Sequence, residues 1–124
     1  GDPSNFIRIR EIYKNDFELI KENLSSYSFT DDETRAAMLK VYQETGYIMD
    51  PHGAVGYLGL KKYLKSNPDA TGIFLETAHP VKFLDVVEPV INKKIAYPPQ
   101  IKSVMDKKKE ARFISSYAEL KDFL

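Results

Sequence analysis

The sequence predicts a helix-rich α/β fold with a few short, mostly parallel, buried strands. Segments with apolar residues at three- and four-residue steps fill most of the chain, and short apolar runs lie between them. The clearest run is residues 73–77, which follows Gly72 and ends in a small polar cluster closed by Pro80. This pattern is typical of a central strand that is buried on both faces and leads into a helix.

The N-terminal part predicts helix over about residues 4–24, because its apolar residues fall on one helical face. Ser4 or Asn5 would cap this helix. Asn15 and Asp16 could instead begin a second helix, so one helix and two helices remain open alternatives.

A second helical segment begins with a capping box. Thr30 is followed three residues later by Glu33, which predicts a helix from that point to about Thr45. Gly46 comes next, at the position where glycine commonly ends a helix in the left-handed conformation. A short buried strand is then expected at residues 47–49.

Asp50 and Pro51 are expected to cap and open the third helix, which ends near Asn67. Glycine recurs along it at every third position, and each glycine costs about 1 kcal/mol relative to alanine. We therefore expect this helix to pack tightly against a neighbouring element or a ligand. The glycines are Gly53, Gly56 and Gly59, and the expected core contacts are Val55, Leu58 and Leu64.

The rest of the sequence predicts three more helices and one further strand. A helix should run from Pro80 until Glu88 and Pro89 disturb it. A short helix is expected at residues 100–106, an edge strand at 112–114, and a final helix capped by Ser116.

Composition narrows the functional classes. The chain has 124 residues, the size of one domain, and we expect a single unit over residues 1–124. Its 18 basic and 18 acidic residues cancel, so no overall field attracts nucleic acid or an anionic membrane. It has no cysteine and no apolar run long enough to span a bilayer, and a cytoplasmic location is expected.

The polar turns allow both structural and chemical interpretations. Thr77 and His79 follow the predicted central strand, where ligands bind in open α/β sheets. On position alone, capping of the next helix by Thr77 or His79 is the better interpretation. Asp50 would likewise occupy the N–H groups that an anion near His52 would need. The two histidines have no paired spacing, so no metal site is predicted.

Three stretches in register resemble the carboxyl-terminal part of threonine synthase. They are Gly-Asp-Pro-Ser-Asn-Phe at residues 1–6 with Arg8, Asp-Pro-His-Gly-Ala-Val-Gly-Tyr at 50–57, and Glu-Thr-Ala-His-Pro-Val-Lys-Phe at 76–83. The resemblance extends over nearly the whole chain and is least distinctive after about residue 98.

The resemblance implies part of a fold-type II pyridoxal-phosphate enzyme. Such an enzyme converts O-phospho-L-homoserine and water to L-threonine and phosphate. Thr77 would then bind the cofactor, with its hydroxyl hydrogen-bonded to the pyridine nitrogen. A neutral hydroxyl, unlike an aspartate, does not hold that nitrogen protonated, so the ring is a milder electron sink. Asn5 and Arg8 would lie near the substrate or its phosphate, although Arg8 could equally be a surface or ion-pair residue of the helix.

The resemblance also implies that essential parts lie elsewhere. In the family, the lysine that binds the cofactor covalently and the loop that holds its phosphate precede the Pro-Ser-Asn-Phe segment. We therefore expect no catalytic residue in this chain, no activity from the chain alone, and self-association through apolar surface that upstream sequence would cover. The rival hypothesis is a stand-alone α/β binding or interaction domain whose polar turns are only caps.

Overall fold

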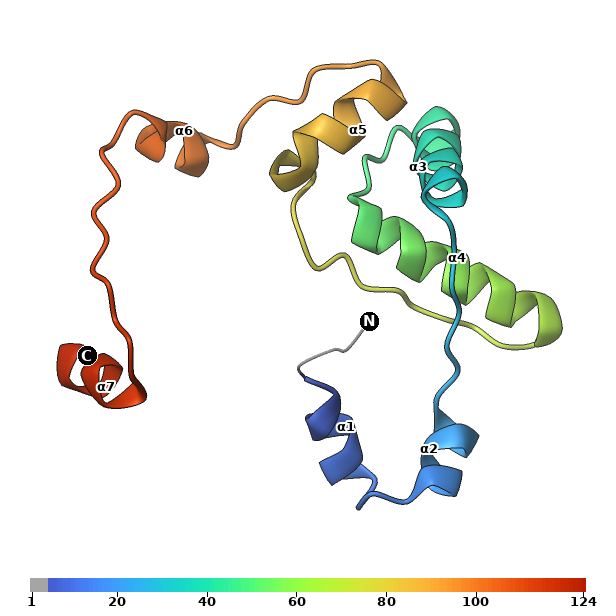
Figure 1. Ribbon diagram of the computed structural model, residues 1–124. Helices are drawn as coiled ribbons and strands as arrows, with labels where there is room; N and C mark the ends of the chain where they lie inside the picture. Colours follow the sequence, from blue (N-terminus) through green and yellow to red (C-terminus); the bar gives the residue numbers. More distant parts are fainter. Residues whose placement is uncertain (1–4) are drawn as a thin grey trace. The chain divides into compact units, whose positions relative to one another are not determined.

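The computed structural model describes residues 5–124, which divide into two compact units (Figure 1). The first unit, up to Lys94, contains α1 (Phe6–Ile12), α2 (Phe17–Asn23), α3 (Asp31–Thr45), α4 (Pro51–Ser66), the 3₁₀ helix η1 (Pro80–Phe83) and α5 (Leu84–Ile91). The second, Ile95–Leu124, contains α6 (Pro99–Met105) and α7 (Tyr117–Phe123).

The predicted α/β fold class is wrong, since no segment of residues 5–124 forms a β-strand. The segments 47–49, 73–77 and 112–114 are neither helix nor strand. A strand needs a neighbouring backbone to pair with, and an apolar run in the sequence does not supply one. The expected burial of the central segment is also wrong, because Ile73 is 88% exposed and Leu75 is 74% exposed.

The N-terminal helical segment is two helices. Lys14 and Asn15 adopt positive φ values of 53° and 58°, which end the first helical run. Asp16 then caps α2, where its carboxylate accepts a hydrogen bond from the Leu19 N–H at 3.0 Å. Asn5 precedes α1 but makes no side-chain capping bond, and Ser4 lies outside the described residues.

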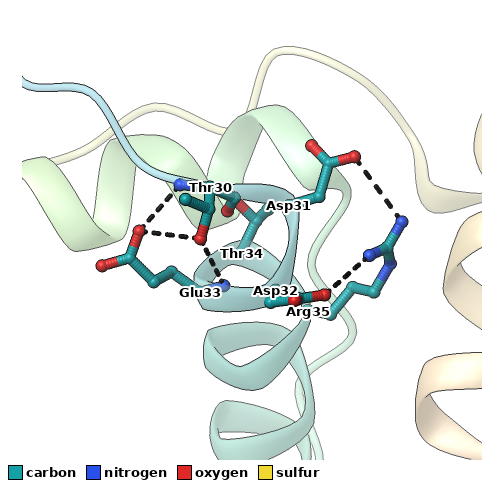
Figure 2. Close-up of polar contacts among 6 residues, drawn as sticks. All are labelled: Thr30, Asp31, Asp32, Glu33, Thr34 and Arg35. Carbon is teal, nitrogen blue, oxygen red and sulfur yellow. Dashed lines mark hydrogen bonds and ion pairs between the residues drawn. The ribbon is translucent and has the colours of Figure 1, made fainter.

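The capping box predicted for α3 is confirmed (Figure 2). The Thr30 hydroxyl accepts a hydrogen bond from the Glu33 N–H at 3.2 Å, and the Glu33 carboxylate accepts one from the Thr30 N–H at 2.7 Å. Both bonds satisfy donors that the first turn of a helix otherwise leaves free. At the other end, Gly46 adopts a φ of 75°, as predicted.

The core of the first unit lies where α3 packs against α4 and α5, with η1 against α5. Its buried apolar residues are Ala37, Met38, Met49, Ala54, Val81, Val87 and Ile91. Two expectations fail here. Val55 is 40% exposed and is not a core contact, and α5 continues through Pro89 to Ile91. The proline removes one hydrogen bond within the helix, and α5 ends two residues later, where Asn92 turns into the left-handed conformation.

In the second unit, the predicted helix capped by Ser116 is confirmed as α7. The Ser116 hydroxyl accepts a hydrogen bond from the Glu119 N–H at 3.2 Å, and the Glu119 carboxylate accepts one from the Ser115 N–H at 2.9 Å. Arg112 lies over the Phe123 ring at 5.4 Å. In the part of the chain that the structure describes, no helix is both long and apolar enough to cross a membrane.

Candidate functional site

The candidate site is built on the first turn of α4. Asp50 caps this helix and is completely buried. Its Oδ1 accepts a hydrogen bond from the His52 N–H at 2.9 Å and lies 2.8 Å from the Nδ1 of the same residue. The prediction that Asp50 is a cap is confirmed. Its carboxylate occupies the helix N–H group that an anion would otherwise use.

Glu76 packs against this turn from the segment that precedes η1. A Cβ atom built on Gly53 would overlap the Glu76 carboxyl group, so the absence of a side chain at Gly53 is what admits Glu76. Asp50 Oδ2 and Glu76 Oε1 are both buried, and neither has a hydrogen-bond donor among residues 5–124. Buried polar atoms without partners are rare in proteins, which marks this pair as unusual.

The pKa values of the two carboxyl groups are shifted in opposite directions. Burial, followed by the neighbouring Asp50 carboxylate, raises the pKa of Glu76 to about 7. Burial also acts to raise the pKa of Asp50, but the neighbouring Glu76 carboxyl group and the hydrogen bonds from His52 outweigh it and lower that pKa below its ordinary value. The pKa of the half-exposed Tyr47 phenol is raised by partial desolvation and by the charges of Glu76 and Asp50.

Two histidines fix the neighbouring turn. The His52 ring packs on the Phe83 ring of η1, with 5.0 Å between ring centroids. His79 caps η1, since its Nδ1 accepts a hydrogen bond from the Val81 N–H at 3.1 Å, and Pro80 follows at the first helical position. His79, not Thr77, is therefore the cap. Among residues 5–124, no three His, Asp or Glu side chains converge to hold a metal ion.

Thr77 lies between these two anchored residues. Glu76 precedes it and is held at α4, and His79 follows it and caps η1. Thr77 itself is exposed, and its hydroxyl makes no hydrogen bond to any residue from 5 to 124. Because its neighbours in the chain are anchored and its hydroxyl has no partner, Thr77 is able to form a hydrogen bond with a ligand.

The three glycines of α4 differ in what they contact. An added Cβ would meet Phe74 at 3.8 Å from Gly56 and Tyr27 at 3.7 Å from Gly59, which are ordinary contacts. Only Gly53 has the close approach that the sequence predicts for all three.

We expect Gly56→Ala to raise the free energy of unfolding by up to about 1 kcal/mol through helix propensity alone.

Gly53→Ala should gain less than Gly56→Ala, because its methyl group must push the Glu76 carboxyl aside. Urea unfolding followed by circular dichroism compares the two variants, with Gly59→Ala as a second control. An equal gain at Gly53 and Gly56 would contradict the close packing.

Comparison with known proteins gives one consistent result. The family model described as "Threonine synthase, C-terminal" matches residues 53–124. The chain belongs to the threonine synthase family. It is 36% identical to a threonine synthase of Buchnera aphidicola from Acyrthosiphon pisum, over 100% of this chain and 28% of that protein. It is 35% identical to a threonine synthase of Escherichia coli K12, over 82% of this chain and 23% of that protein.

Solved threonine synthases share the fold of this chain. The crystal structure of the Escherichia coli enzyme matches with a TM-score of 0.74 and 30% identity, over 98% of this chain and 28% of that chain. A PLP-bound threonine synthase from Brucella melitensis matches with a TM-score of 0.57 and 24% identity, over 86% of this chain. The chain thus spans about a quarter of these relatives and corresponds to the C-terminal region of a threonine synthase.

The other two residues that the family resemblance indicates lie at the start of α1 and within it. Asn5 is exposed, and its carbonyl accepts a hydrogen bond from the Arg8 N–H at 3.0 Å. Arg8 is exposed on α1. Among the described residues, no hydrogen bond or ion pair joins either of them to Thr77. Their roles and that of Thr77 remain predictions.

Sequence reasoning missed Glu76 as a member of the site. One signal was available, because a glutamate directly after the apolar residues 73–75 is unexpected in a segment predicted to be buried. The glycines indicated a close approach to α4 but not its source. The contact between Gly53 and Glu76 identifies that source.

Proposed function

We propose that this chain is the C-terminal part of a pyridoxal-phosphate-dependent threonine synthase of the relatives' length, which acts in the cytoplasm. The reaction is the conversion of O-phospho-L-homoserine and water to L-threonine and phosphate. Membership of the threonine synthase family supports this proposal. The observation that carries it here is the exposed, unpartnered hydroxyl of Thr77 in the Glu-Thr-Ala-His-Pro segment.

The residues present fit the cofactor. Pyridoxal phosphate supplies an electron sink for carbon–hydrogen and carbon–oxygen bond changes in its substrates. Thr77 would donate its hydroxyl proton to the pyridine nitrogen, and as a neutral donor it leaves that nitrogen unprotonated. His79 and Pro80 fix the start of η1 two and three residues further on, which orients the Thr77 backbone.

Asn5 and Arg8 are proposed to act on the substrate side. An arginine guanidinium binds phosphate with two parallel hydrogen bonds, and Arg8 is exposed on α1, so it is accessible to such a group. Asn5 has a side-chain amide that makes no capping bond and is therefore available to a ligand.

The covalent cofactor lysine is proposed to lie upstream of residue 1. Reading the coding sequence before Gly1 tests this, since a long open frame with a lysine-bearing cofactor segment is expected. A start codon directly before Gly1 would contradict the proposal. In parallel, borohydride reduction of the 124-residue chain with pyridoxal phosphate should trap no lysine adduct at a single stoichiometric site, whereas the full-length enzyme should yield one.

The chain studied alone is also proposed to self-associate. Ile73 and Leu75 project outward from one segment, and Tyr47 and Val55 are exposed as well. Large apolar side chains exposed together usually mark an interface. Sedimentation velocity should show association that increases with concentration, and a clean monomer at the highest soluble concentration would count against it.

A further inference from the structure

We propose that Asp50 and Glu76 hold one proton between them, and that this shared proton fixes the segment carrying Thr77 to the first turn of α4. Glu76 is then a positioning residue for Thr77. The importance of Glu76 for catalysis rests on the proposed function. The proton shared between Glu76 and Asp50 does not depend on it.

The geometry places both carboxyl groups at the first turn of α4, each with one oxygen shielded from solvent. Asp50 is completely buried, and Glu76 is half-buried against Gly53. Asp50 Oδ1 is already bonded to His52, while Asp50 Oδ2 and Glu76 Oε1 have no donor among residues 5–124. Two ionised carboxylates in this position would repel each other and leave both oxygens unsatisfied. A proton on Glu76, donated to Asp50, satisfies both groups and leaves a single negative charge.

That remaining charge belongs on Asp50. Asp50 is the cap of α4, where the helix dipole and the His52 N–H favour a carboxylate. Glu76 is partly buried and lies beside a negative charge. Both effects favour its neutral form, and its pKa rises to about 7. The titratable groups that act on the pair are Tyr47, from the segment before α4, and His52, from its first turn.

The bond constrains Thr77 because the two residues are adjacent in the chain. Glu76 ties one end of the turn to α4, and the contact of His52 with Phe83 ties η1 to the same helix end. When Glu76 ionises, the two carboxylates repel and the first of these ties is lost. The predicted consequence is a Thr77 backbone that is ordered at acidic to neutral pH and loosens above about pH 7.

The sign of the stability change follows from proton binding. Between the ordinary glutamate pKa of 4.5 and the raised pKa of about 7, the folded chain holds a proton that the unfolded chain has lost. Stability from this group is therefore complete below pH 4.5 and is lost as the pH rises toward 7. The folding equilibrium constant should fall by up to about tenfold per pH unit within this window.

The experiment is a carboxyl ¹³C NMR titration of Glu76 in the 124-residue chain. The wild type should titrate with a midpoint near 7, and the Thr77 amide resonance should shift with the same midpoint. In Gly53→Ala, the new methyl group displaces the Glu76 carboxyl, so the midpoint should fall toward 4.5. Gly56→Ala is the matched control and should leave the midpoint near 7.

Glu76→Gln provides the second variant. Its amide still donates a hydrogen bond to Asp50 but cannot ionise, so the Thr77 amide and the folding equilibrium should become independent of pH between 4.5 and 7 at this site. If Glu76 only filled space, the pH profiles of the Glu76→Gln variant would be the same as those of the wild type.

Three results would overturn the inference: a wild-type midpoint near 4.5, an unchanged midpoint in Gly53→Ala, or a Thr77 amide that does not follow Glu76. None of these measurements uses the cofactor. If Thr77 did not bind the cofactor, the midpoint would still lie near 7, and if the shared proton were absent, Thr77 substitutions could still impair catalysis. The two proposals can therefore fail separately.

Discussion

Replacing Met38 with alanine is expected to lower the free energy of unfolding of the first unit by about 2–5 kcal/mol. Met38 lies on α3, the helix that packs against both α4 and α5, and it is only 1% exposed. Removing its side chain leaves a cavity that three packed helices can close only in part. Urea unfolding monitored by circular dichroism measures the change.

The neighbouring residue on the same helix serves as the control. Leu39 is 36% exposed, so Leu39→Ala should cost less than half as much as Met38→Ala. A change at Met38 within about 0.5 kcal/mol of wild type, the range typical of surface positions, would contradict a core centred on α3.

Replacing Thr77 with valine is expected to lower kcat/KM roughly 10- to 100-fold in the full-length enzyme. Valine has the shape of threonine but lacks the hydroxyl, and losing the hydrogen bond that we propose Thr77 donates to the cofactor should cost about 1–3 kcal/mol. Because Thr77 is exposed in this chain and bonds to no residue from 5 to 124, folding of the chain should change little. Phosphate release gives the rate, and cofactor fluorescence gives the affinity.

Thr77→Ser is the matched control for this substitution. It retains the hydroxyl and should recover most of the activity and cofactor affinity that the valine variant loses. Equal kinetics for the valine variant and the wild type would remove Thr77 from the site.

Several helix starts were predictable from the sequence because their signals are local. Three of the described helices begin with a residue whose side chain accepts a hydrogen bond from an N–H group two or three residues further on. These residues are Thr30, Asp50 and Ser116. The division of the first helical segment depended on Asn15 and Asp16, and the left-handed backbone at Asn15 decided it. Such contacts need no knowledge of the rest of the fold.

The strands failed for the opposite reason. Residues 73–77 have the composition of a buried strand, but forming a strand depends on backbone partners distant in sequence, and residues 5–124 provide none. Phe74 still packs inward, edge-on to the Tyr57 ring at 5.8 Å, while Ile73 and Leu75 remain exposed. The apolar run thus contains one side chain that packs inward, Phe74, between two that are exposed.

The candidate site was predictable only in part. The family motifs indicated Thr77, and the glycine spacing indicated that something approaches α4 closely. That Glu76 enters the space at Gly53 and meets Asp50 depends on how two segments 26 residues apart pack together, which no local pattern encodes.

A crystal structure of the full-length enzyme with pyridoxal phosphate bound tests the central claim most directly. The account predicts that Thr77 Oγ1 lies about 2.7–3.2 Å from the pyridine nitrogen, with Glu76 beside Gly53 as in this chain. A Thr77 hydroxyl turned away from the cofactor, with another side chain bonded to that nitrogen, would contradict it.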